Sequence, residues 1–565
     1  MLRITELRLP LEHPPAALRA AIAGRLGIAE TAIRRFTVFR RSHDARKKTA
    51  LYFIYTVDVE VGEGDGGECK DSEASLLKKL SGDPHIGPTP ETSYRFVAQA
   101  PDHLARRPVI IGFGPAGIFA ALVLAQMGFR PLVLERGKAV RERTQDTWGL
   151  WRDRTLDPES NVQFGEGGAG TFSDGKLYSQ VKDPRHLGRK VLSEFVKAGA
   201  PEEILYAAKP HIGTFRLVGM VERMRREIES LGGEIRFQCR VAGLRIAPGR
   251  SRRRMCGVIL ANGEEIAADH VVLALGHSAR DTFEMLHAAG VFMEAKAFSV
   301  GFRIEHPQSL IDKARFGPNA GNPLLGAADY KLVHHARNGR SVYSFCMCPG
   351  GQVVAATSEA NCVVTNGMSQ YSRAERNANA GIVVGITPRD YPDDMAGGPS
   401  SALSGIALQR QLERHAFELG GCTYEAPGQL VGDFLAARPS TRLGSVLPSY
   451  QPGVHLTDLS SALPDYAIAA IREALPAFGR QIRGFDMNDA VLTGVETRTS
   501  SPLRITRGTD FQSLNVQGLY PAGEGAGYAG GILSAGIDGI RAAEALALAL
   551  LDQETQTEGP DCRLN

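Results

Sequence analysis

One glycine-rich turn between two short apolar runs constrains this chain more than any other stretch. Residues 109–111 (VII) are apolar enough for a buried strand, and the turn that follows reads GFGPAG over residues 112–117. We expect an apolar helix over 116–127 and a second strand over 131–134 that ends at Glu135. Strand, G-x-G-x-x-G, helix, strand and acid, in this order, predict a dinucleotide-binding unit on a parallel sheet.

Each residue type in the turn has a physical role in this prediction. Gly112 permits the tight turn, Gly114 lets a pyrophosphate approach the backbone, and Gly117 lets the helix pack closely on the sheet. Pro115 and Ala116 begin the helix, whose amino end attracts phosphate through its dipole and free N–H groups.

The acid and the arginines after it extend the candidate site. Glu135 can accept hydrogen bonds from ribose hydroxyls, about twenty residues after the glycines. Arg136 and Arg143 follow in a charged segment and are further candidate cofactor contacts. A glycine-rich turn without a ligand is the alternative, but both strands and the acid favour the nucleotide.

The far end of the chain favours FAD over NAD(P). Residues 519–546 hold a short strand, then Gly523 and Glu524, then Gly531 and Ile532 at the start of a long alanine-rich helix. The positive end of that helix suits the flavin N1/C2 carbonyl edge, where negative charge collects on reduction. An ordinary C-terminal helix with a glycine-rich entry is the alternative.

A second glycine-rich stretch, residues 161–179 (NVQFGEGGAGTFSDGKLYS), is expected to wrap the ribityl chain and the flavin ring. Glycine lets backbone N–H groups face a ligand closely. The predicted contacts are Gly168, Thr171, Ser173, Asp174 and Lys176. The alternative is a flexible surface loop.

Two further predicted strands approach the ligand. We expect a strand over 234–246, with Val241 near the adenine, and a buried strand over 269–276 that ends at Gly276. Polar residues at the carboxyl end of a parallel strand face the ligand crevice, so His277 is a candidate catalytic residue. A helix cap is the alternative for His277 and its neighbours.

Length and composition predict several domains in an α/β fold. The 565 residues exceed one typical domain. We expect a small α+β N-terminal domain (1–98), a Rossmann-type FAD-binding domain (104–290), an inserted α+β cap domain (291–495) and a return segment of the FAD-binding domain (496–550). Residues 62–71 are expected to form a polar loop.

The charge balance gives no general argument for a nucleic-acid or membrane partner. The formal net charge is +3. A basic segment lies at 34–48, which is interpreted as a solvated strand and loop rather than an RNA footprint. No apolar run is long enough to span a membrane, and no signal peptide is recognisable, so a cytoplasmic protein is expected.

Eight cysteines are spread along the chain, which predicts reduced thiols rather than a disulfide framework. Cys346 and Cys348 are one residue apart, so in a strand they share one face, too strained to bridge easily but able to present a thiol pair. Core cysteines, half a metal site and redox thiols beside the flavin are the three interpretations. No metal is expected, because metal sites usually space their cysteines by two to four residues.

The chain resembles a bacterial family of FAD-dependent dehydrogenases (NAD(P)/FAD-dependent oxidoreductases) over nearly its whole length. The resemblance rests on residues 107–137, 161–179, 271–282 (VVLALGHSARDT), 344–351 (SFCMCPGG), 494–505 (GVETRTSSPLRI) and 519–540. It implies an FAD domain of the glutathione-reductase type interrupted by a cap domain, and no particular substrate.

The sequence therefore predicts an FAD-dependent oxidoreductase that transfers hydride between flavin N5 and an unidentified small-molecule substrate. No second complete G-x-G-x-x-G follows a strand, so NAD(P)H is expected only as a transient donor. No C-x₄-C follows the first helix, so disulfide reductase chemistry of the familiar kind is not expected. The alternatives are a flavoprotein acting on RNA and a non-catalytic flavin-bound redox or interaction module.

Overall fold

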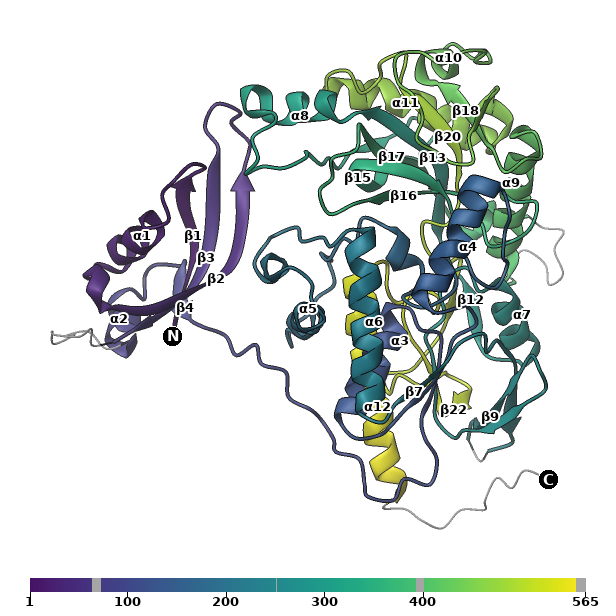
Figure 1. Cartoon of the computed structure of the whole chain (residues 1–565), viewed down its shortest axis with the longest axis horizontal. Coiled ribbons are helices and arrows are strands. Elements are labelled where there is room, and N and C mark those ends of the chain that lie inside the picture. Colours follow the sequence, from purple (N-terminus) through teal and green to yellow (C-terminus); the bar gives the residue numbers. More distant parts are fainter. Residues whose placement is uncertain (63–72, 250, 393–400, 555–565) are drawn as a thin grey trace.

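A computed structural model of the protein describes residues 1–62, 73–249, 251–392 and 401–554. The chain forms a small N-terminal part, a parallel-sheet part and a cap, the last lying across the top in Figure 1. The mixed α/β class predicted from the sequence is confirmed. Most of the polar loop predicted at 62–71 lies outside the described residues.

The N-terminal part is a four-stranded sheet of order β2-β3-β1-β4, with two helices. Its elements are β1 Leu2–Pro10, α1 Ala17–Leu26, β2 Ile33–Asp44, β3 Tyr52–Val61, α2 Glu73–Lys79 and β4 Ile86–Pro88. Apolar residues alternate along β3 and bury one face of the sheet. An extended segment then leads under the molecule to the parallel sheet (Figure 1).

The parallel-sheet part has the strand order β23-β11-β5-β6-β7, and every neighbouring pair is parallel. Its strands are β5 Val109–Ile111, β6 Leu132–Leu134, β7 Glu234–Arg236, β11 Val271–Leu273 and β23 Leu519–Pro521. The helices are α3 Pro115–Gln126, α4 Val140–Asp153, α5 Leu187–Lys197, α6 Thr214–Ser230, α7 Arg280–Ala288 and α12 Ile532–Glu554. The two ends of the chain thus meet in one sheet.

Helices α3 and α12 pack tightly because small residues lie between them. A Cβ added at Gly539 would lie 2.2 Å from the carbonyl oxygen of Ala116, so only glycine fits there. This contact fixes the start of α12 beside the start of α3. Two helix amino ends therefore lie close together at one end of the sheet.

One predicted strand is wrong. Residues 234–246 form two strands, β7 and β8 Val241–Ala247, because Gln238 adopts a left-handed conformation with φ 56°. The N–H of Gln238 donates to the oxygen of Gly137 (3.0 Å), and that of Cys239 to the oxygen of Glu135 (2.9 Å). The chain leaves the parallel sheet and enters a small one with β9 Arg253–Leu260, β10 Glu265–Ala267 and β22 Val516–Gln517.

The cap (residues 298–496) is a mixed eight-stranded sheet of order β14-β15-β17-β13-β20-β18-β19, with β16 paired to β15. Its strands are β13 Phe298–Pro307, β14 Val333–His335, β15 Ser341–Ala355, β16 Thr365–Ser369, β17 Asn377–Ile386, β18 Ala426–Leu430, β19 Val454–Leu456 and β20 Val491–Glu496. Its helices are α8 Gln308–Phe316, α9 Ser404–Leu419, α10 Val431–Leu435 and α11 Asp465–Gln481. The chain enters the cap through β12 Met293–Ala295 and leaves through β21 Leu503–Ile505, which pair with each other.

Polar contacts tie the three parts together. The indole of Trp151, on α4, donates to the oxygen of Ala355 in the cap (2.9 Å). The N–H of Arg41, on β2, donates to the oxygen of Tyr206 (2.6 Å), and its guanidinium stacks over that ring. The N-terminal sheet is therefore attached to the parallel-sheet part through its β2 edge.

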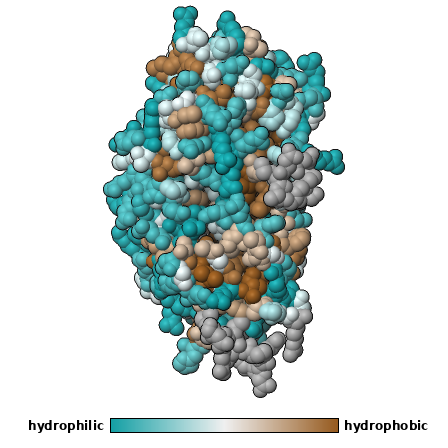
Figure 2. All heavy atoms as spheres, turned by 90° about the vertical axis from the view of Figure 1, so that its right-hand side faces the viewer, coloured by the Kyte–Doolittle hydropathy of each residue, from teal (hydrophilic) through white to brown (hydrophobic). Residues whose placement is uncertain are grey.

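The outer surface is mainly hydrophilic, with local hydrophobic patches, on the face shown in Figure 2. Among the described helices, none combines the length and the apolar character needed to cross a membrane.

Candidate cofactor and substrate site

A cavity of about 820 Å³ lies at the carboxyl ends of β5, β6 and β11, beneath the cap. This volume is at the upper end for ligand pockets, as a dinucleotide with a second ligand requires. Most predicted contacts line it: Gly112, Gly114, Pro115, Ala116, Glu135, Arg136, Gly168, Ser173, Asp174, Lys176, Val241, Gly276, His277, Cys346, Glu524, Gly531 and Ile532.

Five predicted site residues are not part of the cavity wall: Gly117, Arg143, Thr171, Cys348 and Gly523. Gly117 keeps its predicted packing role, since a Cβ there would lie 1.9 Å from the Gly112 oxygen. The N–H of Gly523 donates to Asp538 (2.8 Å), and Thr171 is buried. Gly117, Gly523 and Thr171 therefore support the wall from behind.

Arg143 is a buried support for the glycine-rich loop. Its guanidinium donates to the backbone oxygens of Asn161, Val162 and Glu166 at 2.7 Å each and of Gly165 at 3.3 Å. Burial lowers the pKa of Arg143 to about 10. The predicted contact of Arg143 with the cofactor is corrected, because its donors face loop carbonyls, and a residue buried behind the loop does not reach the cavity.

The turn and the loop form a narrow cradle around the start of α3. A Cβ on Gly168, which has φ 60°, would lie 2.9 Å from the Cα of Gly114. Two backbones therefore meet with no side chain between them, at a helix amino end with free N–H groups. This geometry fits a pyrophosphate, and the residues present fit the FAD predicted from the sequence.

Glu135 organises the backbone around this cradle. Its carboxylate accepts from the N–H groups of Phe113 (2.8 Å), Gly137 (2.9 Å) and Gly165 (3.0 Å). It thus ties the turn after β5 to the glycine-rich loop. Because a carboxylate has about four acceptor positions, it can still accept from a ribose hydroxyl.

Cys346 and Cys348 lie at the cap side of the cavity, beside a lysine from the glycine-rich loop. The ammonium nitrogen of Lys176 is 3.9 Å from the sulfur of Cys346 and 4.0 Å from that of Cys348, and it donates to the oxygen of Met347. Cys348 is fully buried, whereas Cys346 lines the cavity. The structure therefore brings three predicted site residues together.

Two ionisable groups of the cavity have displaced pKa values. Burial lowers the pKa of His277 to about 3, and the charges of Arg498 and Arg280 act in the same direction. This imidazole is neutral at pH 7 but a weak base, which disfavours its predicted role as general base. Burial raises the pKa of Glu524 to about 7, so this carboxyl can hold or release a proton near neutral pH.

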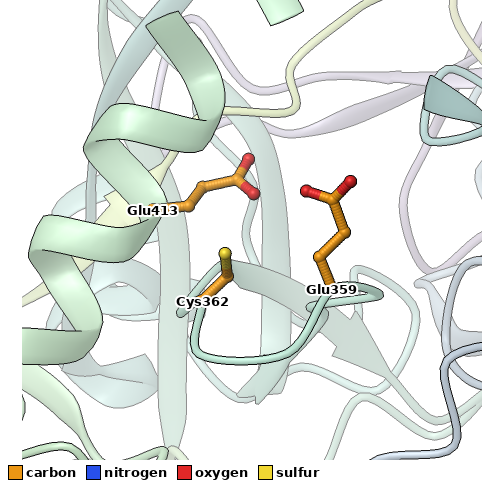
Figure 3. A group of neighbouring side chains, drawn as sticks. All are labelled: Glu359, Cys362 and Glu413. Atoms are coloured by element: carbon orange, nitrogen blue, oxygen red, sulfur yellow. The ribbon is translucent and has the colours of Figure 1, made fainter. Parts of the chain in front are cut away.

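A separate cluster of Glu359, Cys362 and Glu413 has donor atoms within 4.8 Å of one another. In Figure 3 the side chains converge from α9 and from the loop after β15. Both carboxylates form ion pairs with arginines. Guanidinium nitrogens of Arg280 lie 2.6 Å from a carboxylate oxygen of Glu413 and 2.7 Å from one of Glu359, and a nitrogen of Arg498 lies 2.8 Å from an oxygen of Glu413. The cluster is an ion-pair network, and burial raises the pKa of Cys362 to about 11.

Two buried arginines close to the candidate site, Arg303 and Arg498, were not identified from the sequence. Arg303 is fully buried on β13, pairs with Glu496 (2.8 Å) and donates to the oxygen of Cys346 (3.0 Å). Arg498 donates to Ser278 beside His277 (3.0 Å). The sequence signal for Arg303 was its place in FSVGFRI (298–304), a largely apolar run that predicts a buried strand. A charged residue in such a strand is rarely buried without a partner, so a partner could have been expected.

The expectation of reduced thiols concerns eight cysteines along the chain. Among the described residues, Cys239, Cys346, Cys348, Cys362 and Cys422 are free.

Comparisons with known proteins identify relatives for most of the chain. Residues 106–306 match the pyridine nucleotide-disulphide oxidoreductase family, and 297–499 match the family described as FAD-dependent protein, C-terminal domain-like. Residues 1–60 match a domain of unknown function. An uncharacterised protein of Clostridium beijerinckii is 46% identical over 544 residues, covering 96% of this chain and 98% of the relative.

Solved structures show only a distant likeness. CtdE in complex with FAD is 13% identical, with a TM-score of 0.30, over 79% of this chain and 85% of that chain. The halogenase PltM in complex with phloroglucinol and FAD is 12% identical, with a TM-score of 0.36, over 80% of this chain and 70% of that chain.

Proposed function

This chain belongs to a family of FAD-dependent oxidoreductases, and from that premise we propose that it transfers hydride between flavin N5 and a small molecule bound under the cap. One observation carries the proposal: a single cavity is lined by Gly114 and Pro115 at the phosphate turn and by Tyr343 and Cys346 of the cap. A cofactor held at the turn therefore extends toward the cap, where space for a substrate lies.

The protein's own residues have three roles in this proposal. The amino end of α3 and the Gly114–Gly168 contact bind the pyrophosphate, and Glu135 orients the ribose. The amino end of α12, at Ile532, lines the same cavity, and its positive dipole end would stabilise negative charge on a bound flavin. When bound, FAD supplies two-electron chemistry at N5.

The cap side of the cavity excludes water and holds a proton. Strand β15 covers the cavity, so groups below it interact through a medium of lower dielectric than water. Glu524 is the acid–base candidate, because its pKa of about 7 lets it exchange a proton with a substrate near neutral pH. His277, held neutral by burial and by Arg498, acts as a hydrogen-bonding group.

NAD(P)H is the proposed transient electron donor. The family match to pyridine nucleotide-disulphide oxidoreductases supports it. Arg40 and Lys331 line the cavity beside the Lys209–Asp329 ion pair, and the charges of Arg40 and Lys331 suit a phosphate-bearing donor. The RNA alternative gains no support, since Arg34 and Arg35 pair with Glu60.

The first experiment is an absorption spectrum of the purified protein, followed by anaerobic addition of NADH or NADPH. Bands at about 375 and about 450 nm are expected for bound oxidised flavin, and bleaching by a nicotinamide is expected if it is the donor. A yellow protein that resists bleaching removes the nicotinamide from the proposal. A colourless protein that takes up no added FAD contradicts the proposed function.

A further inference from the structure

Strand β15 is interrupted at the cysteines. Phe345 pairs with Gly381 and Cys348 with Asn379 on β17, so β15 carries one residue more than its partner between these pairs. This irregularity is a β-bulge, in which Cys346 adopts a left-handed backbone conformation with φ 43°. That conformation is strained for a residue with a side chain, and such strain is found most often at functional sites.

The bulge changes how the two side chains lie. In a regular strand, Cys346 and Cys348 would be separated along one face. Here the Cys348 sulfur lies 3.3 Å from the backbone oxygen of Cys346, to which it donates. Both sulfurs are also within 4.0 Å of the Lys176 nitrogen, so the thiols converge on one cation.

The charges around the pair are asymmetric. Hydrogen bonding from Cys348 and the charges of Lys176 and Arg303 lower the pKa of Cys346 well below its usual value. The hydrogen bond with Cys346 and burial raise the pKa of Cys348 well above its usual value. The charged and titratable groups that face the pair are Asp174, Lys176, Arg303, Tyr330, Arg373, Glu496 and Glu524.

A core cysteine in the same protein behaves differently. Cys362 is buried beside two carboxylates, and burial raises its pKa to about 11. Burying the ammonium of Lys176 costs free energy unless nearby groups stabilise its charge. Both sulfurs are among the groups that do so here. The surroundings of Cys346 are those of a reactive thiolate that meets the cavity.

We propose that Cys346 and Cys348 form a redox-active pair that exchanges two electrons with the bound flavin. In the oxidising direction, the Cys346 thiolate and the Cys348 thiol form one S–S bond. The Cys348 S–H bond breaks, and two electrons with that proton pass to oxidised FAD, which is thereby reduced. This inference rests on the proposed function, and it names a small thiol or disulfide as the substrate class, reached from the cavity through Cys346.

The first test uses the thiols and needs no turnover. The protein is alkylated with iodoacetamide over a pH series, and the peptide that carries both cysteines is quantified by mass spectrometry. Cys346 is expected to react with a midpoint pH clearly below that of a free thiol. Lys176→Met is expected to move the midpoint up, whereas Cys422→Ser, at an exposed free cysteine, is expected to leave it unchanged.

The second test counts electrons in the flavin-loaded protein. Anaerobic titration with dithionite is expected to consume about four electrons per flavin in the native protein and about two in Cys346→Ser and Cys348→Ser. The oxidised native peptide is expected to carry an intramolecular disulfide that disappears on reduction. Because this mass measurement uses the native protein, it tests the proposal even if the cysteine variants do not fold.

The outcomes separate the two proposals. A protein that binds flavin, consumes only about two electrons and shows no disulfide overturns the redox pair but leaves the proposed function intact. A protein that binds no flavin contradicts the proposed function, while the alkylation midpoint and the disulfide still report on the thiols. A Cys346 midpoint at or above that of a free thiol also overturns the pair.

Discussion

At the scale of single residues, the cavity's most informative group is Glu524. Its folded-state pKa is about 7 because burial disfavours the carboxylate. The folded protein therefore keeps a proton on Glu524 between pH ~4.5 and ~7, where an unfolded chain has already lost it. Because the folded state binds more protons in this window, its stability falls as pH rises through it.

The variant Glu524→Gln is expected to remove that part of the pH dependence. Between pH 5 and pH 8, the flavin-free native protein should lose up to about 3 kcal/mol of unfolding free energy relative to the variant. Urea unfolding at the two pH values measures this difference. If the unfolding free energies of the two proteins changed with pH in the same way, the pKa of Glu524 would not be raised in the folded protein.

Arg143 and Arg141 make a matched pair of residues on the same helix. Arg143 is fully buried and serves four backbone oxygens, whereas Arg141 is 74% exposed and pairs with Glu222. Arg143→Met is expected to cost about 3 kcal/mol or more, because it leaves buried acceptors without donors. Arg141→Met is expected to leave the stability almost unchanged, because its ion pair with Glu222 is exposed to solvent.

Denaturant unfolding and flavin retention after gel filtration check this prediction. Arg143→Met should also release flavin more readily, because residues 161–166 lose their support beside the cradle. If both variants lost similar amounts of unfolding free energy and of flavin, the buried hydrogen bonds of Arg143 would contribute little to stability.

At the scale of elements, the contact between the α3 turn and the glycine-rich loop governs flavin binding. Gly168→Ala adds a Cβ 2.9 Å from Gly114 at a left-handed position, so the cradle must open. We expect at least about tenfold weaker FAD binding, equivalent to about 1.4 kcal/mol. Fluorescence titration of the flavin-free protein with FAD measures it.

Gly263→Ala is the control for backbone strain alone. Gly263 has φ 89° in the β9–β10 turn, and a Cβ there meets nothing within 4 Å. This variant should lose about 1 kcal/mol of stability and keep its affinity for FAD. Equal affinity of the Gly168 variant and the control would contradict a steric role for the cradle.

The sequence predicted those elements whose signals are local. The β5–α3–β6 unit follows from glycine spacing and apolar runs, and the structure has it within a residue or two at each end. The division of 234–246 was missed because Gln238 adopts its left-handed conformation to bond Gly137, a tertiary contact. No local pattern marks it.

The sequence identified individual residues of the candidate site but not which of them lie close together. Cys346, Cys348 and Lys176 each stood out in the sequence, yet 170 positions separate the lysine from the first thiol. Their meeting depends on how the cap lies over the loop and on a bulge that spacing alone does not reveal. Likewise, Glu524 looked like a cofactor contact, and only its burial indicates a proton-holding role.

At the scale of the whole molecule, all three parts contribute to one cavity. The parallel sheet provides the cradle, the cap provides β15, and the N-terminal part provides Arg40 on β2. Arg40 joins Lys209, Lys331 and Asp329 among the lining residues. Because Lys209 pairs with Asp329 at 2.6 Å, the remaining charge of this group is positive.

This charge is expected to select which reagents reach Cys346. Iodoacetate is an anion and iodoacetamide is neutral, so the ratio of their alkylation rates reports the local potential without knowledge of the substrate. Arg40→Glu should lower that ratio several-fold at low salt, and the effect should shrink as added salt screens it. Arg34→Glu changes the same charge on the same strand, but Arg34 pairs with Glu60 and is not among the lining residues, so its ratio should stay near that of the native protein. Equal ratios for both variants would mean that the N-terminal part does not influence entry to the cavity.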